Sequence, residues 1–321
     1  MKQKNPIREK FLSYKDIFFM LFFIVLLFVI GALLIINVNF FPTSSLNLDL
    51  TKKSLPVSTE NEPNTIGIVV SSTLPIEEVT LIYKPLIIYL SKATNKHIVL
   101  FTRKTYSEAL DSMLAGDAQI GIIGSGAFYV DKNKLDLLAV PMINNKTYYK
   151  SYIIAEKENI KNLSDLKGKT IAFTDPYSFA GYIVLENYLR KNGLNLNFFS
   201  KHFFTFSVNS SIDALKEGLA DAATIDSNTY EQLKEKNPEI SNSLHIIWES
   251  PIEIPNPPVI AIKDMDYKTK LQFQKLFMDM DKSTEGKKVL SILGYDKYVE
   301  VNSNFFEPIS EWLGKNNENK F

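Results

Sequence analysis

Short apolar runs alternate with helix-like segments along most of this chain, and this alternation constrains the fold more than any other feature. The strand-like runs lie at residues 66–70, 98–101 and 119–123, and the helix-like segments between them lie at residues 79–91 and 106–115. Apolar side chains recur at helical spacing within those segments, whereas the strand-like runs are short and mostly apolar. This order predicts an α/β fold in which helices cover a mostly parallel sheet.

The same alternation restarts after a break near residue 148. The second series has strand-like runs at residues 170–174, 202–206 and 222–225, and helix-like segments at residues 180–191, 211–218 and 230–236. Two further helix-like segments follow at residues 268–281 and 286–293. The length of 321 residues suits about two domains of about 150 residues each. We therefore expect two α/β units in succession.

Residues 17–36 form a different kind of segment, which reads IFFMLFFIVLLFVIGALLII and contains no charged side chain. A helix of this length rises about 30 Å, which matches the hydrocarbon core of a bilayer. Five basic and two acidic residues precede the segment, and no charge follows it until Asp49. The positive-inside rule therefore predicts a single-pass membrane helix with residues 1–16 in the cytoplasm and the rest of the chain outside it.

Two alternatives to an anchor are open for this segment, a cleaved signal peptide and a buried core helix. The apolar region of a signal peptide is about 7–15 residues long and ends at a small-residue cleavage site. Residues 37–41 read NVNFF and offer no such site, and a buried helix of this length normally keeps a polar face. We favour an uncleaved anchor, followed by a stalk at residues 37–64 and a folded region that is periplasmic or extracellular.

The composition argues against several classes of protein. Lys and Arg total 36, as do Asp and Glu, and a net charge of +0 is not typical of a nucleic-acid binder. The chain has no cysteine, so it has no disulfide, thiolate nucleophile or cysteine-ligated metal. Its three histidines are widely separated, and the GxSxG, P-loop, HExxH and GxGxxG motifs are absent. We therefore expect no enzymatic activity, no metal and no cofactor.

Turns of small residues that join a strand to a helix are the most ligand-like feature of the chain. The residues of these turns are Ser72 and Thr73, Ser125 and Gly126, and Ser178, Phe179, Ala180 and Gly181. In an open α/β sheet such turns lie at the carboxyl ends of the strands, where ligands bind. Free N–H groups at helix N-termini favour anions there. The same residue types also form ordinary caps and turns, so spacing alone leaves both roles open.

Asp226 also follows a strand-like run, and two roles are open for it. Its carboxylate can cap the helix that follows. As a ligand-binding group, the carboxylate would repel a fully ionised anion and would suit a cationic or protonated group.

Five segments, taken in order, resemble the phosphate, phosphite and phosphonate-binding proteins of ABC importers. They are VTLIYKPLIIYLSK (79–92), AGDAQIGIIGSGAFYV (115–130), NLSDLKGKTIAFTDPYSFAGY (162–182), SSIDALKEGLADAATIDSNTYE (210–231) and LGYDKYVEV (293–301). The resemblance implies a two-lobed periplasmic-binding fold of type II. One lobe would combine residues 65–147 with residues 252–321, and the other would span residues 148–251.

The resemblance implies a membrane-anchored, extracytoplasmic solute-binding protein that performs no covalent chemistry. A small phosphonate-like or phosphate-like oxyanion, or a related solute, would bind between the lobes at the turns named above. Hinge closure would hold the ligand, and an ABC permease would receive it. Two other functions are open: a sensory module that signals to a separate membrane protein, and an enzyme built on the same fold.

The chain departs from the family at the turn that should hold the oxyanion. The family commonly has a run of Ser, Thr, Ser and Gly where this chain has Ser178, Phe179, Ala180 and Gly181. Two of the three hydroxyls are therefore missing, and a hydrogen bond from each would contribute about 1.5–3 kcal/mol to the binding of a charged ligand. Ile123 also replaces a family tyrosine. These departures from the family thus predict a pocket that is more apolar than the pockets of other family members.

Overall fold

The structure is a computed structural model that describes residues 64–71 and 76–313. The expected anchor at residues 17–36 lies outside the described residues, as do Ser72, Thr73 and all of the stalk except Asn64. Among the helices of the described residues, none is long and apolar enough to cross a membrane.

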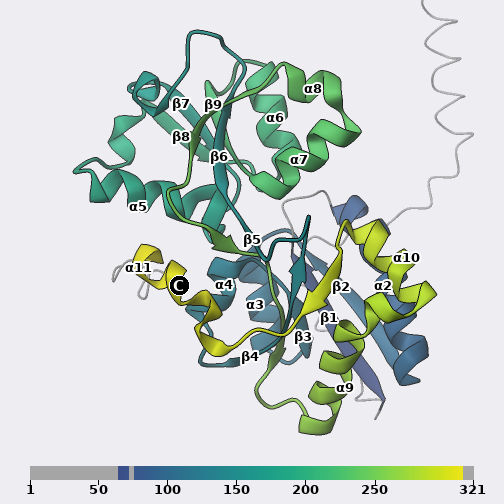
Figure 1. The fold of residues 1–321 in the computed structure, drawn as a ribbon. Coiled ribbons are helices and arrows are strands. Elements are labelled where there is room, and N and C mark those ends of the chain that lie inside the picture. The colour runs from purple at the N-terminus through teal and green to yellow at the C-terminus, as the bar shows by residue number, and fades with distance from the viewer. Residues whose placement is uncertain (1–63, 72–75, 314–321) are drawn as a thin grey trace, which may run out of the picture. The chain divides into compact units, whose positions relative to one another are not determined.

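A six-stranded sheet forms the first part of the fold (Figure 1). In spatial order its strands are β13 (Lys297–Val299), β4 (Leu135–Met142), β12 (Val259–Ile262), β3 (Ile120–Ile122), β1 (Thr65–Ser71) and β2 (His97–Arg103). β1 pairs in parallel with β2 and β3, as expected. β12 is antiparallel to both β3 and β4, and β13 is antiparallel to β4. The expected parallel order is therefore interrupted by the two strands that arrive late in the chain.

Helices cover both faces of the first sheet because successive residues of its strands point to opposite faces. Ile68 and Val70 of β1 pack with one set of helices, and Val69 packs with the other. The first set is α2 (Ile76–Thr94), α9 (Tyr267–Met278), η4 (Met280–Lys282) and α10 (Thr284–Leu293). The second set is α3 (Tyr106–Leu114) and α4 (Ser125–Val130). The two late helices thus complete the layer formed by α2.

A five-stranded sheet forms the second part of the fold. In spatial order its strands are β10 (His245–Glu249), β6 (Ser151–Ala155), β9 (Ala222–Asp226), β7 (Thr170–Phe173) and β8 (Lys201–Phe204). β7 is parallel to β8 and β9, whereas β6 is antiparallel to β9 and β10. Each sheet therefore has three parallel strands on one side, β3, β1 and β2 or β9, β7 and β8, and antiparallel pairs on the other. With the helices that cover both sheets, this makes the fold α/β.

Short helices surround the second sheet and form an apolar cluster on each of its faces. The helical segments are η1 (Leu163–Leu166), η2 (Phe179–Ile183), α5 (Val184–Lys191), η3 (Leu196–Phe198), α6 (Val208–Lys216), α7 (Ser227–Lys236) and α8 (Pro238–Asn242). η2 is a π-helical turn that continues directly into α5. The site described below is built around this turn.

Two segments connect the sheets, and they pair with each other. β5 (Tyr148–Tyr149) and β11 (Ile254–Pro255) form a two-stranded antiparallel ribbon. The last elements of the described residues are η5 (Ser303–Ile309) and α11 (Ser310–Leu313), and α11 packs against α5 (Figure 1). There the Lys191 ammonium lies 3.8 Å from the ring centroid of Trp312.

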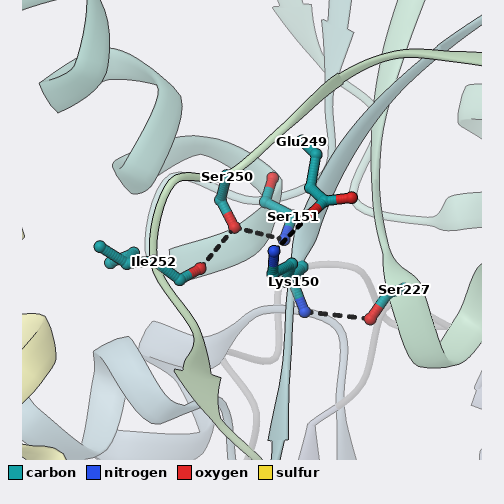
Figure 2. A network of polar contacts seen from close by, with 6 residues as sticks. All are labelled: Lys150, Ser151, Ser227, Glu249, Ser250 and Ile252. Carbon is teal, nitrogen blue, oxygen red and sulfur yellow. Dashed lines mark hydrogen bonds and ion pairs between the residues drawn. The ribbon is translucent and has the colours of Figure 1, made fainter.

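A polar network holds the connecting segments where they enter the second sheet (Figure 2). The Ser250 amide donates to the Ser151 carbonyl at 2.8 Å, and the Ser151 amide donates to the Ser250 hydroxyl at 3.1 Å. The Ser250 hydroxyl in turn donates to the Ile252 carbonyl at 2.7 Å. Lys150 forms an ion pair with Glu249. Both connections are therefore tied together at the edge of the second sheet.

Candidate functional site

A cavity of about 520 Å³ lies at the carboxyl ends of strands from both sheets. Ser71 and Ile122 line it from the ends of β1 and β3, and Thr174 and Asp226 line it from the ends of β7 and β9. This is the position at which ligands bind in open α/β sheets. The cavity is therefore the candidate site of this chain.

The structure brings some of the predicted site residues to this cavity and places others elsewhere. Those that line it are Ser178, Ala180, Gly181 and Asp226. Those that do not line it are Ser125, Gly126 and Phe179. Ser72 and Thr73 lie outside the described residues, although their neighbour Ser71 lines the cavity.

The three predicted residues that do not line the cavity contribute to packing and hydrogen bonding beneath its surface. The buried Ser125 hydroxyl donates to the Pro255 carbonyl at 2.5 Å. A Cβ atom on Gly126 would lie 2.9 Å from the Tyr177 carbonyl oxygen, so a side chain would not fit there. The Phe179 side chain is 1% exposed and belongs to the apolar cluster that includes α3 and α4. Phe179 therefore packs beneath the turn.

The turn at residues 178–181 has the geometry of a helix N-terminus. The Ser178 hydroxyl accepts the Gly181 amide at 3.0 Å, which caps η2 and leaves the hydroxyl proton available to donate. The amides of Phe179 and Ala180 have no acceptor among the described residues. Such orphan amides at a helix N-terminus form a site for anions.

Two buried hydroxyls fix the carbonyl groups of this turn. The Ser151 hydroxyl of β6 donates to the Ala180 carbonyl at 2.5 Å. The Thr224 hydroxyl of β9 donates to the Gly181 carbonyl at 2.6 Å. Because the carbonyls point to the sheet, the second sheet itself determines the orientation of the turn. Neither residue carries a sequence signal beyond its place in a strand, and sequence reasoning missed both.

Thr174 is a further residue of the cavity that was not among the predicted site residues. It lines the cavity directly after β7 and is 2% exposed, and its hydroxyl has no hydrogen-bond partner among the described residues. A Cβ atom on Gly181 would lie 1.7 Å from this hydroxyl oxygen. The signal that could have identified Thr174 was its place at a strand end, directly before the turn.

Asp226 both caps a helix and lines the cavity, so the two roles left open by the sequence coexist in the structure. Its carboxylate accepts the Thr229 amide at 2.8 Å and the Thr229 hydroxyl at 2.6 Å. Burial raises the pKa of the Asp226 carboxyl, whereas the hydrogen bonds from Thr229 lower it. Burial also raises the pKa of Tyr149, and the nearby Asp226 charge raises it further. The cavity therefore disfavours additional negative charge at this end.

A buried carboxylate, that of Asp175, joins the two parts of the fold. It accepts the Tyr177 amide at 2.7 Å and the Tyr106 amide, in the first turn of α3, at 3.5 Å. Thr105 and Glu108 form the capping box that begins α3 and so position Tyr106. Burial raises the pKa of Asp175 to about 6, although both amide hydrogen bonds lower it.

The described part of the chain contains no cluster of potential metal ligands. No group of three or more His, Cys, Asp or Glu side chains is placed there to hold a metal ion. The cavity is lined instead by residues with hydroxyl or amide groups, by the acidic residues Asp226, Glu231, Glu235 and Asp296, and by Lys236. These groups suit a ligand that both accepts and donates hydrogen bonds.

Comparison with known protein families gives one match that covers most of the chain. Residues 68–304 match the family described as ABC transporter, phosphonate, periplasmic substrate-binding protein. The Escherichia coli phosphonates-binding periplasmic protein is 32% identical over 155 residues, which are 46% of this chain and 45% of that protein. The Mycolicibacterium smegmatis phosphate-import protein PhnD is 24% identical over 213 residues, which are 62% of this chain and 66% of that protein. The chain thus spans less than two thirds of the length of each of these relatives.

Two solved structures share the fold over most of their length. A binding protein component of an ABC phosphonate transporter from Pseudomonas aeruginosa has a TM-score of 0.72 and 24% identity, and the match covers 78% of this chain and 85% of that one. PhnD1 from Prochlorococcus marinus, solved in complex with methylphosphonate, has a TM-score of 0.72 and 18% identity. That match covers 80% of this chain and 99% of the other. The predicted two-lobed fold of the periplasmic-binding type is thereby confirmed.

Proposed function

We propose a function from one premise: the chain belongs to the family of periplasmic substrate-binding proteins of phosphonate ABC transporters. In this proposal it binds a small phosphonate-like or phosphate-like oxyanion in the cavity and delivers it to an ABC permease. The relatives are named as binding and import proteins, which fits the expectation that the chain performs no covalent chemistry.

The turn at residues 178–181 carries the proposal. It presents the Ser178 hydroxyl and the amides of Phe179 and Ala180 at the start of a helical run that continues through α5. Amide and hydroxyl donors at the positive end of a helix dipole stabilise the charge of an oxyanion without a cationic side chain. This arrangement supports oxyanion binding even though two hydroxyls of the family's run are missing.

Asp226 narrows the kind of oxyanion that the cavity would accept. A carboxylate that faces a fully ionised anion repels it, and neither charge is easily hydrated inside a buried site. A ligand with its own proton donor, such as a singly protonated phosphonate or an added ammonium group, would instead donate to Asp226. We infer that the ligand carries such a donor opposite its charged oxygens.

Hinge closure is part of the proposal, with the connecting segments as the hinge. We assign residues 65–147 and 252–321 to one lobe and residues 148–251 to the other, because the strands of the two sheets fall within these ranges. The network of Ser151, Ser250 and Glu249 would then anchor both connections to the second lobe (Figure 2). Closure around a ligand is an established motion of such proteins.

Attachment to the membrane is the remaining part of the proposal. Residues 17–36 would anchor the chain with its binding region outside the cytoplasm, as their length and flanking charges predict. The full-length protein should then stay with membranes through high-salt and carbonate washes. A mature protein that begins after about residue 37 would contradict the anchor.

Mass spectrometry of the small molecules released from the gently purified full-length chain tests the ligand class. We expect a phosphorus oxyanion that carries a proton donor, in an amount comparable to that of the protein. A parallel preparation of the Ser178→Ala variant should release much less of it. Release of a solute without an oxyanion group would contradict the proposal.

A further inference from the structure

We propose that Thr174 is a ligand-binding residue, whose hydroxyl donates a hydrogen bond to the oxyanion at the turn of residues 178–181. This inference rests on the proposed function and deepens it. It adds a ligand-binding residue from outside that turn.

The hydroxyl of Thr174 differs from the three serine and threonine hydroxyls that are hydrogen-bonded to the backbone of this turn. The Ser151 and Thr224 hydroxyls donate to the carbonyls of Ala180 and Gly181, and the Ser178 hydroxyl accepts an amide. The Thr174 hydroxyl has no partner among the described residues, although it is buried. Buried hydroxyls without partners destabilise a folded protein, so one that persists calls for a specific reason.

The hydroxyl of Thr174 lies where the chain leaves β7 and meets the cavity. Thr174 is one of the residues that line the cavity. Its oxygen lies 1.7 Å from where a Cβ atom on Gly181 would be, next to the capped start of η2. The Phe206 amide donates to the Thr174 carbonyl at 2.7 Å, which fixes the backbone at this point. The hydroxyl therefore has a defined place beside Gly181, in the same turn as the Phe179 and Ala180 amides.

The Thr174 hydroxyl can replace a hydrogen-bond donor that is missing from the turn. The positions of Phe179 and Ala180 lack the hydroxyls that the family resemblance implies, and the Phe179 side chain points into the apolar cluster. A hydroxyl that reaches the same turn from the end of β7 can donate to an oxygen that those missing side chains would have held. Thr174 would thus replace one of the missing hydroxyl donors, from the end of β7 and not from the turn itself.

Paired substitutions test this assignment on the full-length chain, with methylphosphonate and inorganic phosphate as probes in titration calorimetry. Thr174→Val keeps the shape and removes the hydroxyl, and Thr174→Ser keeps the hydroxyl. The Val variant should bind the probe that the wild type prefers about 10- to 100-fold more weakly, because a hydrogen bond to a charged ligand is lost. The Ser variant should stay within about threefold of the wild type.

Thermal unfolding without ligand separates a binding role from a structural one. Since Thr174→Val removes an unsatisfied buried hydroxyl, its unfolding midpoint should equal or exceed that of the wild type. If the Val variant unfolds at a lower temperature than the wild type, the affinity of Thr174→Ala for the probe is compared with that of Thr174→Ser instead. Unchanged affinity in the variants without the hydroxyl would overturn this inference alone. A wild type that binds neither probe would instead contradict the proposed ligand class, and the inference with it.

Discussion

The Thr174 hydroxyl oxygen and the Cα atom of Gly181 are so close that a Cβ atom on residue 181 would lie 1.7 Å from that oxygen. The glycine is therefore required by space, since the Ser178 hydroxyl would also lie within 2.7 Å of the added atom. This contact joins the end of β7 to the turn that we propose as the oxyanion site.

Gly181→Ala should destabilise the protein and weaken oxyanion binding together. The added methyl group must displace Thr174 or Ser178, and such overpacking costs about 1–3 kcal/mol. Urea unfolding of the full-length chain should show the loss. Thr174→Ala added to Gly181→Ala should recover part of it, with the Thr174→Ala single variant as the control. Strictly additive effects of the two substitutions would show that the contact does not exist.

Thr224→Val should weaken both the fold and the site because it leaves the Gly181 carbonyl without its buried donor. An unsatisfied buried carbonyl costs about 1–3 kcal/mol. Thr224→Ser keeps the hydroxyl and serves as the matched control. Equal unfolding free energies and equal affinities for the Val and Ser variants would contradict the positioning role of Thr224.

Phe179 and Ala180 are adjacent in sequence, and substitutions at them should have different effects. Phe179→Ala should lower the free energy of unfolding by about 3–5 kcal/mol, because the side chain is buried in the apolar cluster. Ala180→Ser adds a hydroxyl to a residue that lines the cavity. It should raise affinity for methylphosphonate or phosphate by about tenfold with a much smaller change in stability. An Ala180→Ser variant with unchanged affinity for both probes would show that this side chain does not face the ligand.

The sequence predicted the strand–helix order well because the relevant runs are short and strongly patterned. The expected helix at residues 79–91 lies within α2, and the expected strand at residues 66–70 lies within β1. β4, whose apolar run ends with Pro141 and Met142, was not predicted. The antiparallel insertion of β12 was also missed, because strand direction depends on contacts between residues far apart in the chain.

The candidate site was only partly predictable, because the direction and the hydrogen-bond partners of a side chain depend on the folded structure. Small residues at strand ends indicated Ser178, Gly181 and Asp226, all of which line the cavity. Phe179 and Ala180 belong to the same apolar cluster, but only Ala180 lines the cavity. The sequence could not distinguish the two, because it does not show which residues of a turn face a cavity. Thr174 becomes conspicuous only when its hydroxyl is seen to lack a partner.

The stability of the protein should depend on pH through Asp175. Its folded-state pKa of about 6 lies above the value of about 3.9 expected in an unfolded chain. The folded protein therefore binds more protons between these values, and the free energy of unfolding falls as the pH rises from about 4 to about 6. The Asp175 contribution to the free energy of unfolding is larger by roughly 3 kcal/mol below both pKa values than above them.

Asp175→Asn removes this titration while keeping an oxygen that can accept the Tyr177 amide. Urea unfolding at pH 4 and pH 7 should show a smaller pH dependence in the variant than in the wild type. The dependence that remains should include the contribution of Asp226, whose pKa is also raised by burial. Identical pH dependence in the two proteins would contradict a raised pKa at Asp175.

Titration calorimetry of the full-length chain tests the central claim, which is that the cavity binds a phosphorus oxyanion through the turn at residues 178–181. The panel is methylphosphonate, inorganic phosphate and phosphite, with acetate as the control ligand. We predict saturable binding of at least one phosphorus oxyanion at one site per chain, and a loss of affinity of about tenfold or more in Ser178→Ala. Absence of binding by all three, or equal affinity in the Ser178→Ala variant, would contradict the account.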